Sequence, residues 1–162
     1  MADLLTHALV AFSVLTVGSW RVEWIRKPWI AVGVCGSAIP DLMKIKILVD
    51  PETIESYLGL PFTWVTPATL GGVLLLSAVI TMGFPRTEWR RAYVALLTGA
   101  VLSLVGDWLR AFPDGHSDPW LYPFLLTYRP PTPGLYVTSD PLVLGVVIAV
   151  TTCVLLLDRY RF

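Results

Sequence analysis

The sequence has few charged residues and no excess of either sign. Lysine and arginine together number 12, aspartate and glutamate also number 12, and charged residues make up 15% of the 162-residue chain. A protein that binds nucleic acid needs a basic surface for the phosphates, and a net charge of zero gives no sign of one. We therefore expect no nucleic-acid partner.

Cysteine and the common catalytic motifs are also scarce. The two cysteines, Cys35 and Cys153, lie inside apolar runs without C-x-x-C or zinc-type spacing, so we expect two free, buried thiols. The sequence contains no P-loop, no dinucleotide fingerprint and no Ser/His/Asp or Cys/His nucleophile arrangement. Asp3 stands where a secretory signal would carry basic residues, so the first apolar run is expected to remain as a helix.

What the sequence does have is apolar and aromatic residues. Hydrophobic residues make up 55% of the chain, mean hydropathy is +0.66, and seven Trp and six Tyr suit a protein that places amphipathic rings at two membrane interfaces. We predict an all-α integral membrane bundle of about five short transmembrane helices, forming one domain over residues 1–162 without an internal repeat. The apolar runs cover residues 4–20, 29–43, 67–84, 92–112 and 141–157.

The second apolar run is the shortest. It contains Gly33, Gly36 and Pro40, which weaken or interrupt a helix. Two interpretations follow: a full span that ends early, or a partly re-entrant segment. We favour the span.

The distribution of basic residues predicts the orientation. Cytoplasmic loops retain lysine and arginine, and an outside N-terminus with a cytoplasmic C-terminus places eight of the twelve basic residues inside. Nine of the twelve acids then lie outside, so the external face is acidic. The predicted location is a cell membrane, crossed several times. The eight inside residues are Arg21, Arg26, Lys27, Arg86, Arg90, Arg91, Arg159 and Arg161.

Two external loops have local signals of their own. In the loop over residues 44–66, Asp50 can cap a short helix whose first turn holds Pro51, and we expect this helix to lie on the membrane surface. The loop over residues 113–140 is rich in proline and is expected to form an extended strap over the external end. At its end, Asp140 is interpreted as the cap of the last helix.

Ionisable residues within or beside apolar spans are costly and are candidates for function. His7, Asp41 and Asp107 all fall at the external end of their predicted helices. Asp3 lies one turn before His7, and it serves either the site or the start of the first helix. For Asp107 there is also a purely structural interpretation, an ion pair with Arg110 one turn later.

His116 is a further candidate, in the loop string Asp-Gly-His-Ser-Asp over residues 114–118. A loop histidine between two acids is an occasional metal ligand, and more often it is simply solvated. We keep His116 and Asp3 as additional candidates beside the first three.

Several short strings resemble one known family when they are taken in order. They are Thr6-His7 in the first run, Ile39-Pro40-Asp41 closing the second, Asp107 late in the fourth, Gly115, and Leu121-Tyr122-Pro123-Phe124 in the outer loop. This order and spacing, over nearly the whole chain, resembles the membrane-bound metal-dependent hydrolases. Those small multi-span proteins are thought to share the site plan of zinc-dependent phospholipases C.

The resemblance implies a metal site on the external side. Its ligands would be His7, Asp41 and Asp107, and a divalent metal, zinc in the first instance, would activate water to attack an ester or phosphoester such as a lipid headgroup. Lys44, Lys46 and Arg129 are candidates to hold the anionic group of the substrate.

The chain departs from the family pattern at four positions. Met43, Ala68 and Ser103 stand where the pattern has an acid or a histidine, and Arg110 stands where it often has threonine. We therefore expect metal to bind weakly or not at all, with Arg110 supplying positive charge in its place. Two functions remain open: a hydrolase with an incomplete ligand set, and a non-catalytic membrane scaffold or partner subunit that kept the fold and lost the metal.

Overall fold

The computed structural model describes residues 2–59, 63–117, 119, 121–122, 125, 128–138 and 140–161, without the side chains of residues 2 and 3. Over these residues the protein is all-helical, and its strand-like pairings are two isolated bridges. The predicted all-α class is confirmed.

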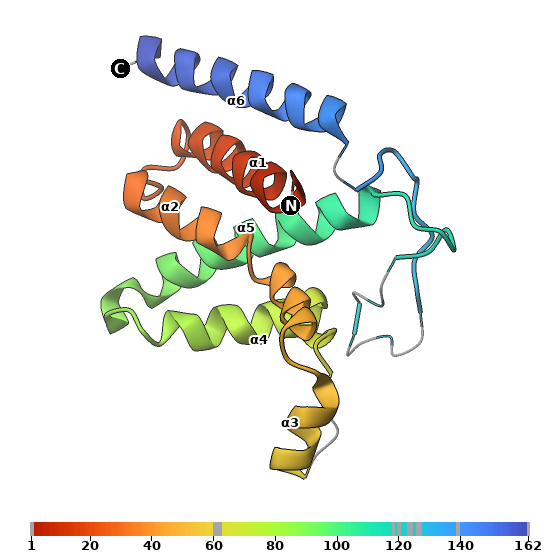
Figure 1. Cartoon of the computed structure of the whole chain (residues 1–162). Coiled ribbons are helices and arrows are strands. Elements are labelled where there is room, and N and C mark those ends of the chain that lie inside the picture. The colour runs from red at the N-terminus through yellow and green to blue at the C-terminus, as the bar shows by residue number, and fades with distance from the viewer. Residues whose placement is uncertain are drawn as a thin grey trace.

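Each of the five apolar runs forms an α-helix in the described chain (Figure 1). These helices are α1 (Ala2–Ser19), α2 (Lys27–Gly36), α4 (Leu70–Thr81), α5 (Trp89–Leu109) and α6 (Pro141–Arg161). Shorter elements lie between them: the 3-10 helices η1 (Pro40–Ile47), η2 (Thr66–Ala68) and η3 (Arg86–Glu88), and the α-helix α3 (Pro51–Leu58).

Within the described part of the chain, two segments are long and apolar enough to cross a membrane, Arg86–Leu109 and Pro141–Arg161. The apolar parts of α1 and α4 are shorter. α6 is exposed along most of its length, with Leu142, Val146, Val150 and Leu157 all on its open surface. An apolar surface of this extent is typical of association with a membrane. Cys35 and Cys153 are free as expected, but they lie exposed on α2 and α6 rather than buried.

α2 is only ten residues long because the chain cannot continue as an α-helix through Pro40. Proline lacks the backbone N–H, and its ring clashes with the carbonyl four residues earlier, here that of Gly36. The chain therefore turns after Gly36 and continues as the 3-10 helix η1. Ten residues of α-helix span about 15 Å, roughly half of a hydrocarbon core.

α2 packs backbone to backbone on α5 through small residues. A Cβ added at Gly36 would lie 2.2 Å from the carbonyl oxygen of Leu96, and one added at Gly99 would lie 1.8 Å from that of Gly33. Ala92 and Ala95 are buried on the same stretch of α5. Close approach through glycine and alanine is typical of helix pairs in membranes, where packing rather than water exclusion drives association.

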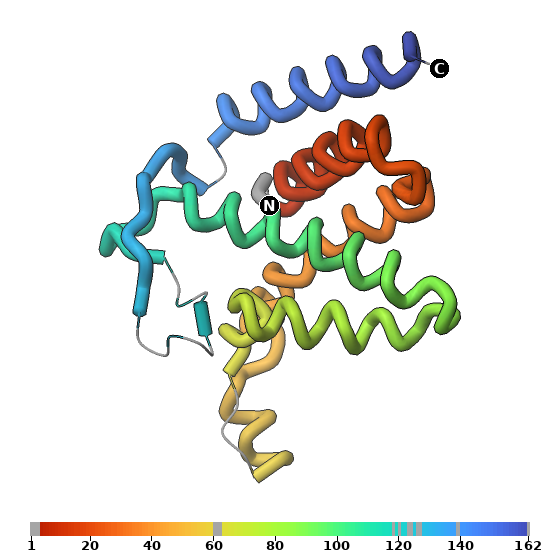
Figure 2. Tube along the Cα trace, turned by 180° about the vertical axis from the view of Figure 1, so that it is seen from behind, coloured from red at the N-terminus to blue at the C-terminus, as the bar shows by residue number. Residues whose placement is uncertain are grey.

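α1 lies between α6 on one side and α2 and α5 on the other (Figures 1 and 2). Ser13 and Thr151 share a hydrogen bond of 3.0 Å between α1 and α6. At the far end of the same pair, Trp20 Nε1 donates to the carboxylate of Asp158 at 2.8 Å. Each of these contacts joins two residues that are 138 positions apart in the sequence. Together they hold the last helix against the first.

The two ends of the bundle differ in chemistry. The starts of α1, α4 and α6 and the ends of α2 and α5 lie together on the right in Figure 1, beside η1 and the loop after α5. The turns 20–26 and 82–88 lie with the C-terminus at the opposite end, and these three segments with the adjoining helix turns hold eight of the twelve basic residues. We call the first of these the acidic end, because it holds Asp41 and Asp107.

The short helix predicted in the loop over residues 44–66 is confirmed as α3. The Asp50 carboxylate accepts a hydrogen bond from the N–H of Glu52 at 3.3 Å, Pro51 occupies the first turn, and Gly59 ends the helix with a φ of 65°. Its Tyr57 and Leu58 are exposed, and α3 projects from the acidic end past α4 (Figure 1).

Candidate functional site

His7 is the most buried of the predicted site residues, with 4% of its surface exposed. Its Nδ1 lies 2.7 Å from the hydroxyl oxygen of Ser103 on α5, a hydrogen bond that fixes the plane of the ring. Its Nε2 faces Asp107 Oδ1 at 3.8 Å, within ion-pair range for a protonated imidazole. α1 and α5 therefore bring His7 and Asp107 together, as the sequence predicted.

Gly106 provides the space for this imidazole. A Cβ at position 106 would lie 3.1 Å from His7 Nε2, so a larger residue would press on the ring. The Gly106 carbonyl also accepts a hydrogen bond of 2.7 Å from the hydroxyl of Tyr136, in the strap. Sequence reasoning missed Gly106, Tyr136 and the ring-orienting part of Ser103. A glycine directly before an acid in a predicted span is the available signal for the first of these.

Each of the two acids carries a cation one helical turn later. Arg110 Nη1 lies 3.6 Å from Asp107 Oδ1, and the Asp41 carboxylate is ion-paired with the ammonium group of Lys44. The Arg110 guanidinium also stacks 4.5 Å from the ring centre of Phe112, which restricts its position. Both i,i+3 pairs follow from helical geometry, so the alternative interpretation of Asp107 as an ion-pair partner describes what the structure contains.

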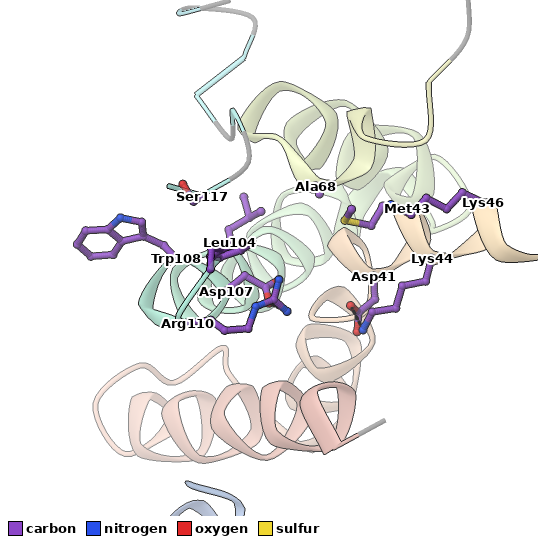
Figure 3. Close-up of a pocket in the computed structure, with 11 residues that line it drawn as sticks. Asp41, Met43, Lys44, Lys46, Ala68, Leu104, Asp107, Trp108, Arg110 and Ser117 are labelled. Atoms are coloured by element: carbon purple, nitrogen blue, oxygen red, sulfur yellow. Dashed lines mark ion pairs between the residues drawn. The ribbon is translucent and has the colours of Figure 1, made fainter. Parts of the chain in front are cut away.

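These pairs line one cavity of about 160 Å³ at the acidic end (Figure 3). Its wall includes three cations, Lys44, Lys46 and Arg110, against two acids, Asp41 and Asp107. The rest of the wall is mostly apolar and comes from η1, η2, α5 and the loop after α5. The cavity thus lies between η1, η2 and the end of α5. His7 is not on its wall, but it contacts the Asp107 carboxylate, which is.

Other predicted residues lie elsewhere. His116 is exposed, with Nδ1 2.8 Å from the carbonyl oxygen of Asp114. Arg129 forms an ion pair of 2.8 Å with Asp114 and donates from Nε to the Ser117 carbonyl at 3.0 Å. A hydrogen bond from the His116 backbone N–H, assisted by Arg129, lowers the pKa of the Asp114 carboxyl. Neither His116 nor Arg129 is among the residues on the cavity wall, although Lys46 is.

The strap is clamped to the end of α5 where it is described. Tyr136 accepts at its carbonyl from the Ala111 N–H at 2.7 Å, and Trp108 Nε1 donates to the Pro131 carbonyl at 2.9 Å. Asp140 accepts from the Leu142 N–H at 2.9 Å, which confirms its predicted capping of α6. The Asp3 side chain, Asp118, Pro123 and Phe124 lie outside the described residues.

The donor set does not fit the three-ligand metal site that the resemblance implies. Among the described residues, no three His, Cys, Asp or Glu side chains are grouped so that they could hold one ion. His7 and Asp107 are close enough to share an ion, but Asp41 is held by Lys44, and Arg110 lies beside the same Asp107 oxygen. A second cation at that oxygen would be repelled by the guanidinium.

No family model, curated protein or solved structure matches this chain. The hydrolase resemblance therefore depends on the short sequence strings alone.

Proposed function

We propose that the chain crosses a cell membrane five times, with α2 and η1 together making the second crossing, an outside N-terminus and a cytoplasmic C-terminus. Support comes from five apolar helices, from glycine-mediated packing between α2 and α5, and from basic turns gathered at one end of the bundle. The acidic end then faces outward, where η1, α3 and the strap meet water and lipid headgroups.

We propose further that the pocket at the acidic end binds a ligand without hydrolysing it. The observation that carries this proposal is the pairing of each acid with a protein cation, Asp41 with Lys44 and Asp107 with Arg110. A carboxylate buried within the membrane needs a counter-charge, because leaving a buried charge unpaired costs roughly 3–5 kcal/mol. Lysine and arginine meet that need here, so no metal is required to keep the acids.

On this proposal the protein is a non-catalytic scaffold or partner subunit with the fold expected for the metal-dependent hydrolases. The role of anion-binding groups would fall to Lys44, Lys46 and Arg110, which in a metal site would only lie beside the ion. His7 would support Asp107 from the opposite side, with its ring held by Ser103.

A second candidate remains the metal-dependent hydrolase. The observation in its favour is that His7 and Asp107, two of the three expected ligands, lie 3.8 Å apart, and that Asp41 lines the cavity with Asp107. If metal bound there, it would supply a Lewis acid and an activated water, and His7 and Asp107 would hold it.

Metal content separates the two candidates. The protein, purified in detergent after growth with zinc and manganese, should contain well under one metal ion per chain when measured by elemental analysis. One tightly held ion per chain would overturn the non-catalytic proposal and favour the hydrolase.

A gain-of-binding variant tests the same pocket in the other direction. Ala68 lines the cavity, so Ala68→His combined with Arg110→Thr should add a ligand and remove the competing cation. Zinc affinity should rise about tenfold or more over wild type. The matched control combines Ala68→His with Arg129→Thr, which removes an arginine that is not on the cavity wall and should gain much less. Equal gains in both variants would contradict the assigned position of Arg110.

A further inference from the structure

A second, larger hollow adjoins the polar cavity. Its volume is about 910 Å³, within the range of about 300–1,000 Å³ that is usual for small-molecule sites. Its apolar lining comes from the start of α1 and the end of η1, and consists of Leu4, Leu5, Ala8 and Ile47. Its polar lining consists of Asp41, Lys44, Arg110 and Thr138.

Asp41, Lys44 and Arg110 belong to the walls of both cavities. The two spaces therefore meet at the ion pairs, with a polar chamber on one side and an apolar groove on the other. A ligand that fills both must be amphiphilic, because one part of it contacts charged groups while the other lies on leucine and isoleucine.

The charged residues on the cavity wall indicate the sign of the charge on the polar part of such a ligand. Three cations and two acids line the polar cavity, so its wall carries a net charge of +1 with both acids ionised (3 − 2 = 1). A phosphodiester carries one negative charge and accepts hydrogen bonds from ammonium and guanidinium groups. It would balance the wall without removing Lys44 or Arg110 from their carboxylates.

The open side of the groove points to the source of this ligand. Leu4, Leu5 and Ile47 are exposed apolar side chains at the start of α1 and the end of η1, and in the proposed topology these segments lie at the external level of the bilayer. The acyl chains of surrounding lipids can contact these side chains there, whereas a soluble anion would leave them exposed to water.

We propose that this composite site binds an anionic phospholipid, with its phosphate between Lys44 and Arg110 and an acyl chain along Leu4, Leu5 and Ile47. This inference rests on the proposed function, because it names the ligand class of the same non-catalytic pocket. It also assigns Arg110 as an anion contact in place of Arg129, which pairs with Asp114 away from the cavity wall.

The test measures binding of phosphatidylglycerol and phosphatidylcholine to the purified full-length protein by native mass spectrometry. Wild-type protein should retain phosphatidylglycerol in preference to phosphatidylcholine. The double variants Asp41→Asn with Lys44→Gln, and Asp107→Asn with Arg110→Gln, should each weaken phosphatidylglycerol binding about tenfold or more. Each double variant removes both members of an ion pair, so neither leaves its former partner as an unpaired charge that could unfold the protein.

Two matched controls isolate the two halves of the site. Arg129→Gln removes a cation that is not on the wall and should leave phosphatidylglycerol binding unchanged. Leu5→Ser should weaken binding, whereas Val146→Ser, on α6 and comparably exposed (55% against 50%), should not. Equal binding by Leu5→Ser and wild type would overturn the placement of the acyl chain.

The remaining outcomes also decide the inference. Absence of a preference for phosphatidylglycerol would overturn it, and so would competition by soluble glycerol phosphate at the same concentration as the lipid, since the ligand would then be a free anion. Intact lipid recovered from metal-free protein supports both the inference and the proposed function. Metal-free protein that binds no lipid overturns this inference alone, while lipid cleaved by metal-loaded protein overturns the proposed function.

Discussion

Gly99 of α5 allows α2 to approach closely. We expect its replacement by alanine to lower the free energy of unfolding substantially. An added Cβ would lie 1.8 Å from the carbonyl oxygen of Gly33 and 2.9 Å from the backbone nitrogen of Ser37. Carbon and oxygen atoms of packed helices approach to about 3.3 Å, so the two backbones must separate by roughly 1.5 Å.

The cost follows from what the new methyl group meets. Overpacking of a close-packed interior costs about 1–3 kcal/mol, and the upper value of about 3 kcal/mol applies here because backbone atoms cannot rotate out of the way. Asp41 follows α2 while Asp107 belongs to α5, so the same displacement should also widen the cavity between them.

The measurement is the free energy of unfolding in mixed micelles, from titration with a denaturing detergent and the fluorescence of the seven tryptophans. The control is Gly145→Ala on α6, where a Cβ would meet nothing within 4 Å. That variant should match wild type or gain up to about 1 kcal/mol from helix propensity.

A Gly99→Ala protein as stable as Gly145→Ala would refute the reasoning. It would mean that α2 and α5 do not pack through their glycines, and the relative position of Asp41 and Asp107 would lose its physical basis.

The remaining predictions concern topology, the histidine and the strap. In a cysteine-free background, a cysteine at Arg90 should resist an impermeant thiol reagent in intact cells, while one at Asp114 should react. Ser103→Ala should cost about 1–3 kcal/mol in the same unfolding assay because it leaves His7 Nδ1 buried without a partner. Ser77→Ala should be nearly neutral, since the Ser77 hydroxyl is equally buried but has no hydrogen-bond partner among the described residues. Tyr136→Phe should accelerate amide hydrogen exchange in the strap, since it removes a hydrogen bond worth about 0.5–1.5 kcal/mol.

Each of these predictions can be contradicted. Labelling at position 90 with protection at position 114 would invert the proposed topology. Equal losses for the two serine variants would mean that the loss reflects burial of a hydroxyl rather than its bond to the histidine. Unchanged exchange in Tyr136→Phe would show that the backbone hydrogen bonds at Ala111 and Leu135 hold the strap by themselves.

The helices could be predicted from the sequence because their signals are local. Apolar runs longer than about 12 residues, Asp50 before Pro51, and Asp140 before Pro141 act through neighbours in the chain, and the structure contains all of them. The length of α2 is not fixed by these local signals, because proline and glycine weaken a helix without determining the residue at which it ends.

Part of the candidate site was equally local. Asp41 with Lys44 and Asp107 with Arg110 are separated by three residues, so helical geometry alone brings each pair within reach. His7 is a candidate because an ionisable side chain inside an apolar run costs free energy and so indicates a functional role.

The contacts that build the site between helices depended on tertiary structure. Ser103 and His7 lie 96 residues apart in sequence, and the sequence indicated only that serine stands where a ligand was expected. Arg110, rather than Arg129, lines the cavities because the strap turns Arg129 toward Asp114. The sequence by itself determined which segments are helical and which charges pair within a turn, since both depend on spacing along the chain. Which charges face the same cavity was decided only when α2 and α5 packed through their glycines, because that distance depends on the absence of side chains on two different helices.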